Sequence, residues 1–353
     1  MKLSLVVTVA VSAASLAFAQ TGAPALKTGA IKTGAIDKIK VHGRSLEGNL
    51  EGDPAERDVY VYLPPSYATN HTQRYPVVYL LHGYGRRVET WVPFIGLPSA
   101  ADKDIASGTA KEMILVIPDA HTLYGGSMYS SSPTTGDWES FITNDLVSYV
   151  DIHYRTIANR DSRGLGGHSM GGYGVWRIAM KHPEVYSSIY ALSACCLMNN
   201  PQVRLAPTAK QAAPPKGAPD PNDTGNVTFG EAAAWSPNPM NPPQFFDLPV
   251  KDGQLQPSIA AKWVANSPLA MADQYVPNLK KYRAIAMDVG LQDSLAGANR
   301  NFDQALTQLG VSHTFETFVG EHSDHLKERV ELKVLPFFSD NLTFPSARPS
   351  KHK

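Results

Sequence analysis

Cysteine is scarce in this sequence: the 353 residues contain two, Cys195 and Cys196, and these are adjacent. Adjacent cysteines fit the geometry of a disulfide poorly, so we expect a fold without disulfide cross-links. We interpret both as small buried apolar residues that follow an apolar strand; a redox role is the alternative. A chain of this length buries enough apolar surface to fold without cross-links.

An excess of charge of either sign is also absent. The chain has 32 basic and 32 acidic residues, which gives a formal net charge of zero. Nucleic-acid binding depends on a basic field, and the sequence has none in bulk or as a run. We therefore expect no nucleic-acid partner.

Long hydrophobic runs are missing too, except at the N-terminus. There, Lys2 precedes an apolar run over residues 3–16, and Ala17-Phe18-Ala19 follows. The run is shorter than the ~20 residues that span a bilayer, which disfavours the alternative of a membrane anchor. A positive start, an apolar run and a small-x-small site are typical of a signal peptide, here residues 1–19. The sequence therefore predicts a secreted or periplasmic protein with no membrane partner.

After the signal peptide, a five-residue repeat (27–31 and 32–36) favours a flexible leader over residues 20–37. Strand and helix patterns then alternate over a predicted domain at 38–340, with a tail at 341–353. Alternation of this kind is typical of an α/β fold with a mainly parallel central sheet and helices on both faces. The expected strands are residues 58–63, 76–81, 113–117, 163–168, 187–192, 283–289 and 313–318. The expected helices are residues 141–154, 173–181, 299–309 and 325–338, the last bent at Pro336.

One segment, residues 199–260, breaks this alternation. It is rich in Pro, Asn, Ala and Gly and has little periodicity. A structureless loop of this length is unusual in a compact domain. We interpret it as a lid-like or surface insertion with short helices; a disordered excursion is the alternative.

The most informative motif is Gly167-His168-Ser169-Met170-Gly171-Gly172. It follows an expected strand and precedes an expected helix, which is the setting of a nucleophile elbow. Glycines two residues on either side of the serine avoid clashes of Cβ atoms with the neighbouring strand and helix. Ser169 is therefore the candidate nucleophile, and a glycine-rich turn without chemistry is the alternative.

A serine nucleophile needs a histidine base and a carboxylate that orients the histidine. In folds with a nucleophile elbow, these residues follow along the chain in the order Ser, acid, His. Asp293 follows the strand at 283–289, and His322 follows the strand at 313–318. Asp288 is a second candidate acid inside the strand, and His325 is a rival base at the start of the next helix. His322 and His325 could also form a metal pair, but no further ligands have matching spacing, so we expect no metal.

A tetrahedral intermediate also needs donors for its oxyanion. The candidates are the backbone N–H of Met170, directly after the serine, and that of Tyr84. Tyr84 lies in a glycine-rich loop, Leu80 to Gly85, that follows the strand at 76–81. As an alternative, these glycines only form a tight turn.

Five segments together resemble the esterase D family. They are Tyr62-Leu63-Pro64-Pro65-Ser66-Tyr67, Tyr79-Leu80-Leu81-His82-Gly83, the pair Tyr149-Val150-Asp151 and Tyr154-Arg155-Thr156, and Gly167-His168-Ser169-Met170-Gly171-Gly172. That family includes feruloyl and acetyl-xylan esterases, S-formylglutathione hydrolases and the antigen 85 mycolyltransferases. The resemblance covers about residues 55–195 and 280–337 and implies an α/β-hydrolase fold without a cofactor. It also implies a triad of Ser169, Asp293 and His322 with an oxyanion hole at Tyr84 and Met170.

With the export signal, the resemblance implies a secreted serine esterase that acts on feruloyl or acetyl esters of polysaccharide or on a small-molecule ester. Trp91 and Trp235 are candidate substrate-binding residues, with packing in the core as the alternative for each. An acyltransferase of the antigen 85 type would use the same triad. A non-catalytic binding protein on the same scaffold is a further alternative.

Overall fold

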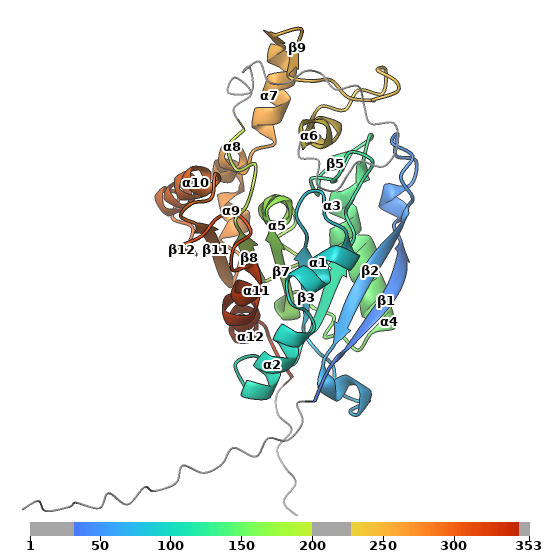
Figure 1. Ribbon diagram of the computed structural model, residues 1–353, viewed down its shortest axis with the longest axis vertical. Helices are drawn as coiled ribbons and strands as arrows, with labels where there is room; N and C mark the ends of the chain where they lie inside the picture. The colour runs from blue at the N-terminus through green and yellow to red at the C-terminus, as the bar shows by residue number, and fades with distance from the viewer. Residues whose placement is uncertain (1–31, 200–226, 346–353) are drawn as a thin grey trace, which may run out of the picture. The chain divides into compact units, whose positions relative to one another are not determined.

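An eight-stranded sheet forms the centre of the fold in the computed structural model, which describes residues 32–199 and 227–345 (Figure 1). The strand order is β1-β2-β4-β3-β7-β8-β11-β12. β2 pairs antiparallel with both of its neighbours, and the remaining neighbours pair in parallel. The predicted mainly parallel α/β sheet is confirmed. The strands are β1 (Ala35–His42), β2 (Glu56–Leu63), β3 (Val77–Leu81), β4 (Ile114–Pro118), β7 (Arg163–His168), β8 (Ser188–Leu192), β11 (Ala284–Gly290) and β12 (Thr314–Phe318).

The apolar runs of the sequence form the inner strands. Every residue of β3, β4 and β8 is buried, as expected for parallel strands that are covered on both faces. β1 is different because most of its residues are exposed, and it lies at the edge of the sheet. It begins at Ala35, so the prediction of a flexible leader up to residue 37 is wrong for its last three residues. The domain therefore begins before residue 38.

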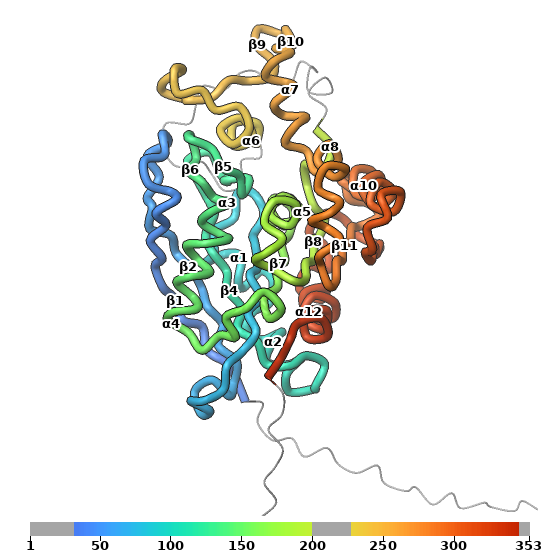
Figure 2. The backbone as a smooth tube through the Cα atoms, turned by 180° about the vertical axis from the view of Figure 1, so that it is seen from behind, coloured from blue at the N-terminus to red at the C-terminus, as the bar shows by residue number. Residues whose placement is uncertain are grey.

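Helices cover both faces of the sheet. One face packs against α4, α5 and α10, and the other against α1, α2, α11 and α12. Figure 1 shows α1 and α2 in front of the sheet, and Figure 2 shows α4 and α5 from the other side. The helices are α1 (Val88–Phe94), α2 (Ser99–Ser107), α3 (Trp138–Ser140), α4 (Leu146–His153), α5 (Met170–Lys181), α6 (Val227–Trp235), α7 (Pro257–Ala265), α8 (Pro268–Met271), α9 (Val276–Leu279), α10 (Ala296–Gln308), α11 (Leu326–Arg329) and α12 (Leu335–Asn341).

Two of the predicted helices contain π-helical turns. The predicted helix at 141–154 begins as the π segment Phe141–Asp145 and continues as α4. The predicted helix at 325–338 consists of α11, the π segment Val330–Val334 and α12. Pro336 lies directly after the π segment, in the first turn of α12, so the residue that has no N–H to donate within the helix coincides with the change from π-helical to α-helical turns.

The insertion contains short helices where it is described. Both α6 and α7 lie within it or at its end, and two short strands, β9 (Val250–Lys251) and β10 (Gln254–Leu255), form a hairpin between them. α6 is more deeply buried than a surface insertion requires, because its Ala232, Ala233 and Ala234 belong to the main core. Its Ala233 carbonyl accepts a hydrogen bond from the Ser132 hydroxyl, in the short hairpin of β5 (Ser131–Ser132) and β6 (Gly136–Asp137).

Parts of several predicted segments lie outside the described residues. They are the signal peptide at 1–19, residues 20–31 of the leader, residues 200–226 of the insertion and residues 346–353 of the tail. Within 32–199 and 227–345, none of the helices combines the length and the apolar character needed to cross a membrane.

Candidate active site

Ser169 lies at a sharp turn between β7 and α5. Its backbone has φ 57° and ψ −114°, which is strained for a residue with a side chain. A Cβ atom added at Gly167 would lie 2.5 Å from the Gly171 carbonyl oxygen, and one added at Gly171 would lie 2.1 Å from the Leu81 carbonyl oxygen. Only glycine fits at both positions. The turn therefore has the features of the nucleophile elbow expected from the sequence.

His322 and Asp293 lie in line with this serine. The Nε2 atom of His322 is 2.8 Å from Ser169 Oγ, and its Nδ1 atom is 2.8 Å from Asp293 Oδ2. The Asp293 side chain is fully buried, whereas the His322 side chain is 36% exposed. Because an ionised carboxylate only accepts, Nδ1 carries the proton and donates it, and Nε2 accepts from the Ser169 hydroxyl. This arrangement suits removal of the serine proton by the imidazole.

The environment keeps Asp293 ionised. Burial alone would raise the pKa of this carboxyl, but hydrogen bonds from His322 and from the Leu295 backbone N–H outweigh it. The pKa of Asp293 therefore lies below its ordinary value of 3.8. A charged acceptor fixes the His322 tautomer and stabilises an imidazolium if one forms.

The structure separates the rival candidates from this line. Asp288 lies inside β11, fully buried, and forms an ion pair with Arg329. His325 begins α11 with a left-handed backbone (φ 55°), and its ring packs edge-on against Phe318. Of the two candidate acids and the two candidate bases, the structure thus places Asp293 and His322 in the hydrogen-bonded line that ends at the serine.

The loop of the predicted oxyanion donor passes beside Ser169. A Cβ atom added at Gly83 would be 3.4 Å from the Cβ atom of Ser169. The Gly83 carbonyl accepts from the Arg86 N–H and lies 2.8 Å from His82 Nδ1. Since N–H and C=O point in opposite directions in a trans peptide, these bonds turn the Tyr84 N–H away from His82. Met170, whose N–H is the second predicted donor, opens α5 directly after Ser169.

His82 is a functional candidate that the sequence interpretation missed. It is fully buried, and burial lowers its pKa, so the ring is neutral. Its Nε2 atom accepts from the Ala120 N–H at 2.7 Å, which leaves the proton on Nδ1 to be donated to Gly83. The signal in the sequence was its place directly before Gly83 in the oxyanion loop.

Trp91 and Trp235 lie in the core, which corrects their prediction as substrate-binding residues. Trp91 is 3% exposed and stacks on His168, with ring centroids 5.6 Å apart. Trp235 is 2% exposed and packs against Tyr173 and Trp263. Rings buried to this extent present almost no surface to a substrate, and the alternative of a packing role holds for both.

The described residues do not indicate a metal centre. Within residues 32–199 and 227–345, no group of three or more His, Cys, Asp or Glu side chains could hold a metal ion.

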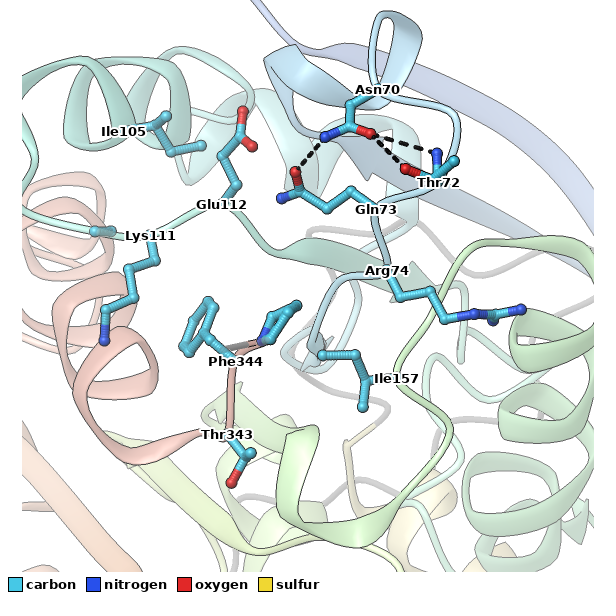
Figure 3. Close-up of a pocket in the computed structure, with 12 residues that line it drawn as sticks. Asn70, Thr72, Gln73, Arg74, Ile105, Lys111, Glu112, Ile157, Thr343 and Phe344 are labelled. Carbon is cyan, nitrogen blue, oxygen red and sulfur yellow. Dashed lines mark hydrogen bonds between the residues drawn. The ribbon is translucent and has the colours of Figure 1, made fainter. Parts of the chain in front are cut away.

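A pocket of ≈ 980 Å³ lies between Arg74, Lys111, Ile157 and Phe344 (Figure 3). Arg74, Lys111 and Ile157 precede strands β3, β4 and β7, whereas Ser169 follows β7. This pocket is therefore at the opposite edge of the sheet from Ser169.

The chain belongs to a known family. Residues 54–329, most of the chain, match the family described as "Putative esterase". Over 132 residues the chain is 34% identical to an esterase of Mycobacterium tuberculosis, a match that covers 37% of this chain and 27% of that relative. Over 132 residues it is 32% identical to an endo-1,4-beta-xylanase/feruloyl esterase of Xylanibacter ruminicola, covering 36% of this chain and 18% of that relative. The matches thus span about a quarter or less of the length of these curated relatives.

Solved structures show the same fold. A ferulic acid esterase superposes with a TM-score of 0.64 at 23% identity, covering 88% of this chain and 99% of the other. An S-formylglutathione hydrolase from Agrobacterium tumefaciens superposes with a TM-score of 0.58 at 15% identity, covering 88% and 97%. The chain has the α/β-hydrolase fold that the sequence predicted.

Proposed function

We propose that this protein is a serine carboxylic ester hydrolase with Ser169 as its nucleophile. The observation that carries the proposal is the continuous line of hydrogen-bond distances from Ser169 Oγ through His322 to Asp293, built on a strained elbow. Membership of the esterase family supports it.

The proposed reaction has two steps. His322 takes the Ser169 hydroxyl proton as Oγ attacks the ester carbonyl, and the N–H groups of Tyr84 and Met170 stabilise the oxyanion. The imidazolium then protonates the leaving alcohol, which gives an acyl-enzyme. A water molecule, deprotonated by His322, attacks that acyl group; the imidazolium then returns the proton to Ser169 Oγ as the acid leaves. Asp293 stays ionised throughout and stabilises the imidazolium.

The proposed substrates are feruloyl or acetyl esters of polysaccharide. A relative named endo-1,4-beta-xylanase/feruloyl esterase and a fold neighbour named ferulic acid esterase support this choice. A feruloyl esterase module from Clostridium thermocellum, described in complex with sinapinate, has a similar fold with a TM-score of 0.54 at 16% identity. The signal-peptide pattern at residues 1–19 supports secretion or periplasmic export, which gives access to such polymers.

The test is hydrolysis of p-nitrophenyl acetate, p-nitrophenyl butyrate and methyl ferulate by the wild type and by Ser169→Ala. We expect the variant to lose at least about 10³-fold in kcat. Ser99→Ala makes the same chemical change at an exposed serine in α2 and should keep full activity. Equal rates for the wild type and Ser169→Ala would refute the nucleophile. Transfer of the acyl group to a hydroxyl of an added sugar, instead of to water, would indicate an acyltransferase.

Export has its own test. Expression of the full chain with its N-terminus intact, followed by N-terminal sequencing of the protein outside the cytoplasm, should give a first residue near position 20. An uncleaved chain retained in the cytoplasm would contradict the export proposal and leave the esterase proposal unaffected.

A further inference from the structure

His168, the residue before the candidate nucleophile, is a buried titratable group that the proposed mechanism does not use. It is 4% exposed and ends strand β7. Its ring packs against two others: Trp91, stacked at 5.6 Å with an interplanar angle of 19°, and His322, at 4.7 Å and 38°. Burial and these two contacts leave this ring little freedom to rotate.

Among the described residues, the His168 ring makes a hydrogen bond to the segment that carries the base. Its Nε2 atom is 2.9 Å from the backbone carbonyl oxygen of His322. A carbonyl only accepts, so Nε2 carries the proton and donates it. Burial first, and the neighbouring His322 second, lower the pKa of His168 to about 3. The ring is therefore neutral at neutral pH, with Nδ1 unprotonated.

Neutrality matters because of what the neighbouring ring does. During the proposed reaction His322 becomes an imidazolium, and a second positive charge 4.7 Å away would oppose it. A buried histidine that stays neutral can donate a hydrogen bond at this place without that cost. Lysine or arginine could not.

The bond from His168 differs from the other bonds that hold the same loop. Gln292 accepts from the Gly320 N–H, and Asp324 accepts from the Glu321 N–H, both through exposed groups. His168 instead acts at His322 itself and from a buried side chain. Since Ser169 is its covalent neighbour, this bond joins the nucleophile segment to the backbone of the base segment, in addition to the contact between Ser169 Oγ and His322 Nε2.

We propose that His168 is a positioning residue, which holds the His322 backbone so that the imidazole stays between Ser169 and Asp293. This inference rests on the proposed serine-hydrolase function. Catalytic groups need to be held within about 0.5 Å of their productive geometry, and the side chain of His322, the middle member of the line, is 36% exposed. The hydrogen bond from His168 supplies a buried restraint on the His322 backbone.

The test compares His168→Gln with His168→Met. Both side chains have the length of the histidine path to Nε2, but only glutamine has a donor there. We expect His168→Met to lose about 10- to 100-fold in kcat, with KM changed less than about 2-fold. His168→Gln should recover most of that loss. Melting temperatures of the two variants show whether they are equally well folded, so that the kcat difference reports the donor.

Equal kcat values for the two variants, or a wild-type kcat for His168→Met, would overturn the inference. Ser169→Ala is measured beside them, so that failure of the inference about His168 can be told from failure of the proposed function. A fully active His168→Met together with an inactive Ser169→Ala refutes only the role of His168. A second readout needs no substrate. The downfield NMR signal of the His322 Nδ1 proton, identified by its loss in His322→Ala, should persist in His168→Gln and broaden or shift in His168→Met; an unchanged signal in both would also overturn the inference.

Discussion

The imidazole of His322 lies 2.8 Å from the hydroxyl of Ser169, although 153 positions separate them in the sequence. The sheet topology explains this. Ser169 follows β7, Asp293 follows β11 and His322 follows β12, and these strands run parallel within one sheet. Their carboxyl ends meet at one edge, where parallel α/β sheets place their sites. Each of the three residues thus lies in the loop that follows a parallel strand; β7 and β11 are mostly buried, whereas β12 is the partly exposed strand at the end of the sheet.

Asp293→Asn should abolish most of the activity while the protein stays folded. An amide has no charge to stabilise the imidazolium and can hold the histidine in the wrong tautomer, so we expect kcat to fall by roughly 10²- to 10⁴-fold. The assay is steady-state hydrolysis of p-nitrophenyl acetate at pH 7 to 8.

The matched change is Asp288→Asn, at the other candidate acid. Asp288 pairs with the buried Arg329, so its loss should lower the melting temperature but leave kcat per folded molecule within about 3-fold. If Asp288→Asn abolished kcat and Asp293→Asn did not, the assignment of the acid would be reversed.

His82→Leu should reduce kcat through the oxyanion loop. Without the donor to Gly83, the Gly83–Tyr84 peptide is free to turn, and we expect a loss of about 10- to 100-fold. His82→Asn, of nearly the same shape as leucine, keeps a donor at the place of Nδ1 and should retain more of the activity. The same low kcat in both variants, at similar melting temperatures, would argue against a role for this hydrogen bond.

Gly171→Ala should prevent formation of the elbow. Its Cβ atom would lie 2.1 Å from the Leu81 carbonyl oxygen, which belongs to a buried strand and has no room to move. We expect a poorly folded protein, measured by chemical denaturation. The control is Gly297→Ala in α10, where nothing lies within 4 Å of the added atom. That change should be neutral or stabilise by up to about 1 kcal/mol, because alanine favours the helix. A normally stable Gly171→Ala would contradict the steric account.

Glu139→Gln should destabilise the fold in a way that depends on pH. Glu139 is buried and pairs with Arg177 and Lys181 of α5, the helix that begins after Ser169. Burial alone would raise the pKa of Glu139, but its basic neighbours outweigh it and hold the pKa far below 4.5. A lowered pKa stabilises the fold fully above the unfolded value near 4.5, and this contribution is lost as pH falls below it.

We therefore expect Glu139→Gln to cost about 3 to 5 kcal/mol in the free energy of unfolding at pH 7, measured with urea. The difference from the wild type should shrink between pH 4.5 and pH 3. A difference that does not change over this range would show that Glu139 acts through packing and not through its charge.

The local patterns of the sequence predicted the parts of this fold that local chemistry determines. The continuous apolar run that forms β3 requires a strand covered on both faces, and the glycines around Ser169 require a turn in which Cβ atoms do not fit. The assignment of Ser169, Asp293 and His322 then followed from their chain order and from the place of each one after an expected strand. The structure brings these three together.

What the sequence left out depends on distant neighbours. β1 escaped prediction because an edge strand with charged side chains has no apolar run. The burial of Trp91 and Trp235 depends on residues distant in the sequence: Trp91 packs on His168, and Trp235 packs on Tyr173 and Trp263. The hydrogen bonds of His82 and His168 go to backbone carbonyls, whose directions exist only once the loops are folded. No residue pattern encodes such bonds.

The most direct test of the account is to trap the nucleophile covalently. The wild type and Ser169→Ala are treated with a fluorophosphonate and examined by intact-protein and peptide mass spectrometry. We expect one adduct per wild-type chain, on the peptide that contains Ser169, and none on the variant. An adduct on another residue, or equal labelling of Ser169→Ala, would contradict the assignment of Ser169 as the nucleophile.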